Sequence, residues 1–248
     1  MSLALSRASV RTGLPAALVI GVAFAFSAPA AVGAGPGAKA RPLLQKKVEA
    51  LKESAAENQK KLRAYTWTET VKVTANGREL PERVSICSYG PDGKVHRTPV
   101  ADTAPAAAGR KRGRLAERVV EKKKGEMKDY MADVSHLISR YVPPDPKMIQ
   151  KAFAADKADF SRGKDGASLV FRDYALRGDS LTIYFDAERR DIRRLDVASW
   201  LDSPQDAVTL GVELASLPDG THHPARSVLD ATARDLHVVT TNSGYRRK

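Results

Sequence analysis

The sequence predicts an α+β fold in which a curved antiparallel sheet, a half-barrel, packs against amphipathic helices. In one stretch of the second half of the chain, Leu181, Ile183 and Phe185 alternate with polar residues. One apolar and one polar face are typical of an antiparallel sheet with a single covered side. Segments with a helical period precede this region and are expected to cover that side. The strands are expected at residues 168–175, 179–187, 191–201, 206–216, 221–231 and 235–243.

The N-terminal third predicts a helix followed by a hairpin. Between residues 41 and 62, apolar residues recur at spacings of three, four or seven: Leu44, Val48, Leu51, Ala55 and Leu62. From Tyr65 the period changes to two, which indicates a strand. Asn76-Gly77 predicts a tight hairpin turn because both residues tolerate positive φ. Residues 78–90 are then expected to form the partner strand.

Two further helices are expected in the middle of the chain. Residues 101–113 have no period and are expected to form a mobile basic linker. A helical period resumes at Leu115, and its apolar stripe is continuous from Met127 to Tyr141. We expect this half of the helix to dock firmly on the sheet as a lid or inner wall. Asp145 and Pro146 suit the N-cap and first turn of a shorter helix.

The N-terminus carries the features of a secretory signal peptide. Arg7 and Arg11 precede the apolar run Leu14–Phe26, and small residues follow. We expect a signal at residues 1–34 and one mature domain at 35–248, in the periplasm or secreted; an uncleaved membrane anchor is the alternative. The lone Cys87 excludes an internal disulfide. It is expected to be buried, with intermolecular pairing as the other interpretation.

This order of elements resembles the periplasmic lipoprotein-carrier superfamily, the Lol-type carriers and related envelope proteins. The resemblance is carried by the signal-like N-terminus, by the helix that passes into "LRAYTWTETVKV" and by the C-terminal run of strands. The resemblance lies in the order of the elements. Exported bacterial proteins of unassigned activity share it. The resemblance implies an incomplete barrel whose helices enclose an apolar cavity for acyl chains. No functional residues of that family match motif positions here, so none are transferred.

Six residues are candidates for lining such a cavity: Trp67, Val71, Met127, Met131, Val134 and Leu210. A ligand is expected to contact the helix stripe on one side and Trp67 and Leu210 on the other. Large aromatic residues are ordinarily core residues, so a packed Trp67 is the competing interpretation. The first functional hypothesis is therefore an exported protein that binds a lipid, a lipoprotein acyl chain or another apolar ligand.

The basic segment within residues 109–131 suggests a second hypothesis, an interaction module that docks on anionic surfaces or on a protein partner. The candidate residues are Arg114, Arg118, Lys122 and Lys123, and the first three fall at i, i+4 and i+8 on one helical ridge. A solvated helix face is the simpler interpretation of such a charge run. Nucleic acid is disfavoured as a partner because no aromatic residues interleave the basic ones to stack on bases.

No catalytic motif occurs in the sequence, which favours a protein that is not an enzyme and needs no cofactor. Nucleophile-elbow, P-loop and zincin patterns are all missing. The histidine pair His222-His223 is expected at the surface of a hairpin, since neighbours on a strand point to opposite faces. A metal site there would need Asp219 or His237 brought close by the fold. No metal site is therefore expected.

Overall fold

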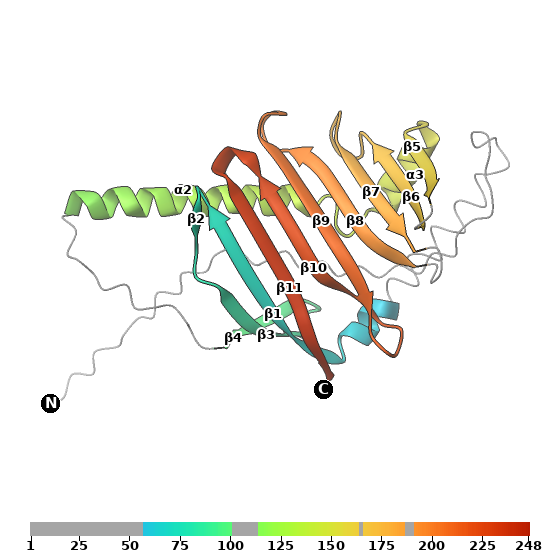
Figure 1. Cartoon of the computed structure of the whole chain (residues 1–248), viewed down its shortest axis with the longest axis horizontal. Helices are drawn as coiled ribbons and strands as arrows, with labels where there is room; N and C mark the ends of the chain where they lie inside the picture. The colour runs from blue at the N-terminus through green and yellow to red at the C-terminus, as the bar shows by residue number, and fades with distance from the viewer. Residues whose placement is uncertain (1–56, 101–113, 164–165, 187–190) are drawn as a thin grey trace.

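The computed structural model describes residues 57–100, 114–163, 166–186 and 191–248 (Figure 1). Its main feature is a curved, open antiparallel sheet with helices on one face, which confirms the predicted α+β half-barrel. The strands are β1 (Tyr65–Ala75), β2 (Arg78–Glu79), β3 (Arg83–Tyr89), β4 (Val95–Pro99), β5 (Ala158–Gly163), β6 (Gly166–Arg172), β7 (Ser180–Phe185), β8 (Ile192–Trp200), β9 (Ala207–Ser216), β10 (His222–Ala231) and β11 (Leu236–Arg247). The helices are α2 (Arg114–Ile138), α3 (Pro146–Ala154) and the 3-10 turn η1 (Thr232–Arg234), and residues 57–62 are also helical.

The strand order explains why helices lie across the sheet. The order is β4-β3-β1-β11-β10-β9-β8-β7-β6-β5, with β2 beside β1. Strands β1, β3 and β4 therefore follow one another to one edge of the sheet. The later strands begin with β5 at the opposite edge and lie side by side in chain order, until β11 pairs with β1. The chain must pass from one edge to the other between β4 and β5. Helices α2 and α3 make this crossing on a single face, the covered face.

Strand register assembles the covered face from alternating residues of consecutive strands. One continuous row runs across seven strands: Val73, Val238, Leu229, Leu210, Val197, Leu181 and Phe171. All seven side chains are apolar. On the opposite face, one row is polar or charged: Thr70, Thr241, Arg226 and Glu213. Alternation within each strand thus becomes one apolar layer for the whole sheet.

The N-terminal hairpin follows the sequence prediction at its turn and departs from it afterwards. Asn76 and Gly77 have φ values of 50° and 67°, as expected for a two-residue turn. The return strand is split: only Arg78 and Glu79 pair with β1, and residues 80–82 are not in a strand. Pro81 lacks the N–H that a continuous ladder needs. The predicted single partner strand is therefore the two strands β2 and β3.

Helix α2 packs only along its C-terminal half. Val134, Leu137 and Ile138 are buried, and residues 121–126 are exposed. The predicted docking of the stripe from Met127 to Tyr141 is confirmed. Helix α3 also begins as predicted: the Asp145 side chain accepts a hydrogen bond from the Lys147 N–H at 2.8 Å, and Pro146 is in the first turn.

Two strands have no counterpart in the sequence prediction. Strand β5 is exposed along nearly its whole length, and β4 has no fully buried residue. Both lie at the ends of the sheet, where one side has no neighbouring strand among the described residues. An edge strand with few core contacts needs no apolar alternation, so the pattern that identified the other strands is weak here.

Candidate functional site

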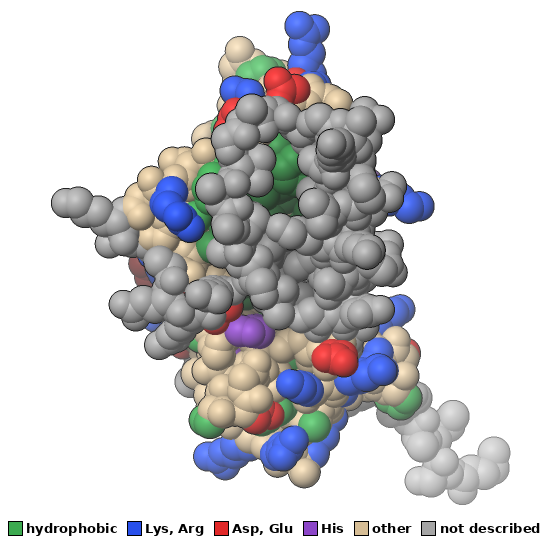
Figure 2. All heavy atoms as spheres, turned by 90° about the vertical axis from the view of Figure 1, so that its right-hand side faces the viewer, with side chains coloured by type: hydrophobic (Ala, Val, Ile, Leu, Met, Phe, Trp, Pro, Cys, Tyr) green, Lys and Arg blue, Asp and Glu red, His purple; other side chains and the backbone are tan. Residues whose placement is uncertain are grey.

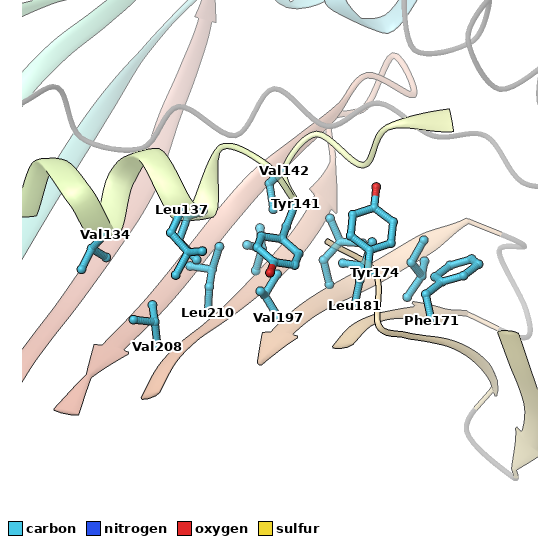
Figure 3. Packing of buried hydrophobic residues seen from close by; sticks show 14 of the residues in the cluster. Val134, Leu137, Tyr141, Val142, Phe171, Tyr174, Leu181, Val197, Val208 and Leu210 are labelled. Atoms are coloured by element: carbon cyan, nitrogen blue, oxygen red, sulfur yellow. The ribbon is translucent and has the colours of Figure 1, made fainter. Parts of the chain in front are cut away.

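The candidate site is the apolar layer between α2 and the covered face. Figure 3 shows Val134, Leu137 and Tyr141 on the helix side, facing strand residues that include Val208 and Leu210. Leu210 and Val134 are each 2% exposed, and Tyr141 is fully buried. Because these side chains are buried and packed against one another, they fix the C-terminal half of α2 to the sheet.

Polar contacts show the path of α2 over the strand ends. The Glu126 carboxylate lies 3.9 Å from the Arg234 guanidinium, between β10 and β11. One turn later the Tyr130 hydroxyl donates to Asp206 Oδ1 at 2.9 Å, just before β9. The Tyr141 hydroxyl reaches Ser199 of β8 at 2.7 Å. The helix and the residues that follow it thus pass over successive strands from β11 towards β8, and the N-terminal half of α2 projects past the sheet (Figure 1).

Where α2 leaves the sheet, apolar side chains on both walls are only partly buried. Met127 and Met131 on the helix, and Leu229 and Val238 on the covered face of β10 and β11, all pack against the main core. None of the four is fully buried, unlike Val134 and Leu210 next to them. We call these four residues the exit margin. Figure 2 shows a different face, the right-hand side of Figure 1, where hydrophobic side chains are visible together with charged ones.

The structure brings together five of the six residues expected to line a cavity. Val71, Val134 and Leu210 belong to the main core, and Met127 and Met131 pack against it. Trp67 does not join them. It lies four residues before Val71 on β1 and belongs to a second cluster, with Leu62, Cys87 and Tyr89.

The Trp67 cluster is built from distant segments of the chain. The indole stacks on Tyr245 with 5.6 Å between ring centroids, and its Nε1–H donates to Asn242 Oδ1 at 3.1 Å. Cys87 is a free, fully buried thiol, which confirms the expected burial. Burial raises the pKa of this thiol to about 12. The cysteine therefore behaves as a small apolar residue of the cluster.

An ion pair separates the two clusters on the same side of β1. Glu69 is 5% exposed, and Arg97 of β4 donates to both of its carboxylate oxygens, at 2.7 and 3.1 Å. A buried carboxylate is tolerated only when it is paired and hydrogen-bonded. Glu69 lies between Trp67 and Val71 in the alternation of β1, so it marks where the apolar layer under α2 ends.

A buried carboxylate anchors the chain that follows α2. Asp179 is 2% exposed, and its oxygens accept hydrogen bonds from the backbone N–H groups of Tyr174 at 2.5 Å and Leu176 at 2.6 Å. The Tyr141 hydroxyl donates to the same carboxylate at 2.5 Å, so Ser199 donates to Tyr141. Burial and the bond to Asp179 raise the pKa of Tyr141. Sequence reasoning missed this cluster, because its members come from three separate segments.

Comparison with known proteins gives two weak likenesses, both to solved structures. No family model matches the chain, and no curated protein matches it. A crystal structure of a DUF1329 family protein from Desulfovibrio piger is similar over 87% of this chain and 94% of its own, with a TM-score of 0.37 and 9% identity. A LolA superfamily protein from Nitrosomonas europaea is similar over 77% and 91%, with a TM-score of 0.32 and 6% identity. Both likenesses are weak.

Within the described residues the histidine pair belongs to no metal-binding group, and one member is not at the surface. Among the described residues, no group of three or more His, Cys, Asp or Glu side chains could hold a metal ion. His223 is 6% exposed, with its ring 4.1 Å from that of Tyr245, so the prediction of two surface histidines was wrong for it. The aromatic neighbour was not visible in the sequence, since Tyr245 lies on another strand. His237 pairs instead with Asp230 at 2.6 Å.

His222 lies near a serine and a carboxylate, in an arrangement that does not suit nucleophilic catalysis. The same ring atom, Nδ1, lies 2.9 Å from Ser216 Oγ and 3.8 Å from Asp191 Oδ2. A catalytic triad uses one imidazole nitrogen for the carboxylate and the other for the nucleophile. Here both partners compete for one nitrogen, so the ring cannot relay a proton between them.

The basic candidates lie on the projecting half of α2. Arg118, Lys122 and Lys123 are exposed, and Arg114 begins the helix, with its side chain outside the described part. Residues 1–34 and 101–113, the expected signal peptide and linker, also lie outside it. In the part of the chain that is described, no helix has the length and apolar character needed to cross a membrane.

Proposed function

We propose that the protein binds a lipid or another apolar ligand between α2 and the covered face of the sheet, and that it does so without catalysis or a cofactor. The observation that carries this proposal is the exit margin. Met127 and Met131 face a sheet whose apolar row continues through Leu229 and Val238, yet these four side chains are left partly exposed. Clustered, partly exposed apolar side chains at the rim of a core are typical of ligand sites.

The way α2 is held supports access for such a ligand. At its C-terminal end the chain is anchored by the buried hydrogen bonds of Tyr141 with Asp179 and Ser199. At the exit margin α2 is held by an exposed ion pair, with Glu126 and Arg234 3.9 Å apart and both about 43% exposed, and by the hydrogen bond from Tyr130 to Asp206 at 2.9 Å. Exposed ion pairs contribute about 0–1 kcal/mol. Access for a ligand then depends on the unbranched methionine side chains, which adapt to a chain that enters.

The proposed setting is the periplasm or another exported location. The support is the composition of residues 1–34, where two arginines precede an apolar run and small residues. A carrier of apolar molecules is needed where they must cross water between membranes. The ligand in this setting is a lipid or the acyl chains of a lipoprotein.

A fluorescent fatty acid, parinaric acid, tests binding. The full chain lacking residues 1–34 is titrated with the probe, and the comparison is between Met131→Glu and Ala132→Glu. Ala132 is exposed, about 100° further round the helix, so its variant adds the same charge away from the sheet. We expect Met131→Glu to weaken binding at least tenfold and Ala132→Glu to leave it unchanged. No saturable binding by the wild type overturns the proposal.

A second candidate function, docking on anionic membranes, is favoured by the exposure of Arg118 and Lys122 on the projecting half of α2. Basic residues near an anionic lipid surface contribute about 1 kcal/mol each. The test is sedimentation with phosphatidylglycerol vesicles at low salt. Arg118→Glu/Lys122→Glu should release the protein, and Lys147→Glu/Lys151→Glu on α3, with the same change in net charge, should not. Equal release by both variants would leave only net charge as the cause.

A further inference from the structure

The helix face that docks α2 on the sheet is interrupted by a lysine, Lys123, at the exit margin. Successive residues of an α-helix are about 100° apart, so Lys123 lies about 40° from Met127 in direction and one turn before it. Met127, Met131 and Val134 continue this stripe into the core. Lys122 points about 140° away from Met127 by the same geometry. Of these two neighbouring lysines, Lys123 is therefore the one on the sheet-facing side.

Lys123 has no ionic partner among the described residues. The carboxylate one turn further along, Glu126, pairs instead with Arg234 of η1. Lys123 is exposed, and α2 projects past the sheet at this point (Figure 1). A lysine at a stripe position cannot be packed against an apolar sheet, because burying an unpaired ammonium is costly. Lys123 accordingly stays exposed, one turn before Met127.

We propose that Lys123 binds the anionic headgroup of an amphiphile whose apolar chain lies against Met127 and Met131. This inference rests on the proposed function and specifies its ligand class: a single molecule with an acyl or alkyl chain and a phosphate or carboxylate head. The apolar contacts and the ammonium follow one another along one helix face, in the order that such a molecule presents them. An ammonium binds a phosphate or carboxylate through charge-assisted hydrogen bonds.

Two lysophospholipids with the same acyl chain separate the headgroup contribution from that of the chain. Isothermal titration below the micelle concentration uses lysophosphatidic acid, which is anionic, and lysophosphatidylcholine, which is zwitterionic. We expect Lys123→Gln to weaken binding of lysophosphatidic acid roughly tenfold, the worth of one charge-assisted hydrogen bond. Binding of lysophosphatidylcholine should change by less than about twofold. Lys122→Gln is the matched control and should change neither, and Lys123→Arg should retain anionic binding.

The outcomes distinguish failure of the proposed lipid binding from failure of the headgroup inference. If wild type binds neither lipid, the proposed function fails and the headgroup inference with it. If wild type binds both and Lys123→Gln alters neither or both equally, the function stands and the headgroup inference is overturned. Equal loss with Lys122→Gln shows general attraction to a basic helix and also overturns it. Inorganic phosphate at millimolar concentration is a separate arm: competition by phosphate alone would show an anion site independent of the chain.

Discussion

The hydroxyl of Tyr141 lies 2.5 Å from Oδ2 of Asp179 and joins the end of the α2 segment to the turn before β7. The same carboxylate holds the backbone of residues 174–176, so one buried charge organises two chain segments that are 38 residues apart. It fixes the C-terminal end of α2 on the sheet, away from the exit margin. The stability of the anchor and the binding of ligand are therefore separable properties of one helix.

The hydrogen bonds of Asp179 predict that Tyr141→Phe and Asp179→Ala lower the unfolding free energy by different amounts. Tyr141→Phe removes one charge-assisted hydrogen bond and should cost about 1–2 kcal/mol of unfolding free energy. Asp179→Ala leaves buried N–H and hydroxyl donors unpaired and should cost at least about 3 kcal/mol. Thermal unfolding measures both, at roughly 2–4 °C per kcal/mol for a domain of this size. Equal, small shifts for the two variants would show that the carboxylate is not the organising group.

The core and the exit margin should respond differently to truncation. Val134 is 2% exposed, so Val134→Ala should cost about 1–3 kcal/mol of stability. Met127 is only partly buried, and Met127→Ala should cost less than about 1 kcal/mol but weaken binding of parinaric acid several-fold. Denaturant unfolding and probe titration of both variants check this. A Met127→Ala variant with full binding and a large loss of stability would make Met127 an ordinary core residue.

The regular parts of the fold could be predicted from the sequence because each rests on a local signal. Strand β7 shows strict alternation, Asn76-Gly77 supports positive φ, and Asp145 caps α3 through its own side chain. Strand β5 was not predicted, because a strand exposed at the edge of the sheet does not need alternating apolar residues.

Which residues contact one another in the site was harder to predict from the sequence than the fold. Trp67 and Val71 share one face of β1, and four residues of strand separate them by about 13 Å. Alternation therefore gave the correct face for Trp67 but not its neighbours, Tyr245 and Asn242, which β11 brings from the far end of the chain. The Asp179 cluster is hidden for the same reason, since its geometry depends on three segments meeting.

Burial of His223 predicts a loss of stability in mild acid. Burial lowers the pKa of this imidazole below its ordinary value near 6.5. In the unfolded chain the ring gains a proton as pH falls through 6.5, and the folded protein resists that gain. Stability should therefore decrease from about pH 7 downwards until the folded-state pKa is reached.

The variant His223→Phe keeps a ring against Tyr245 and removes the titrating group. We expect its melting temperature to fall less between pH 7 and pH 5 than that of the wild type. If His223→Phe shows the full pH dependence, another histidine is responsible.

The thiol of Cys87 should be unreactive in the folded protein. It is fully buried, and with a pKa raised to about 12 it carries negligible thiolate near pH 8. Ellman's reagent should therefore modify it only after unfolding, with one thiol per chain in denaturant. Rapid modification of the native protein, or a disulfide-linked dimer on a non-reducing gel, would contradict the buried position.

Photo-crosslinking at Met131 tests most directly whether α2 and the sheet hold an apolar ligand. Benzoylphenylalanine replaces Met131 in one protein and Ala132 in another, and the full chain is expressed, purified without detergent and irradiated. Mass spectrometry should then find a covalent adduct with the mass of a lipid or acyl chain at position 131 and none at position 132. Folded protein that carries no lipid adduct at position 131, or equal adducts at both positions, would contradict the account.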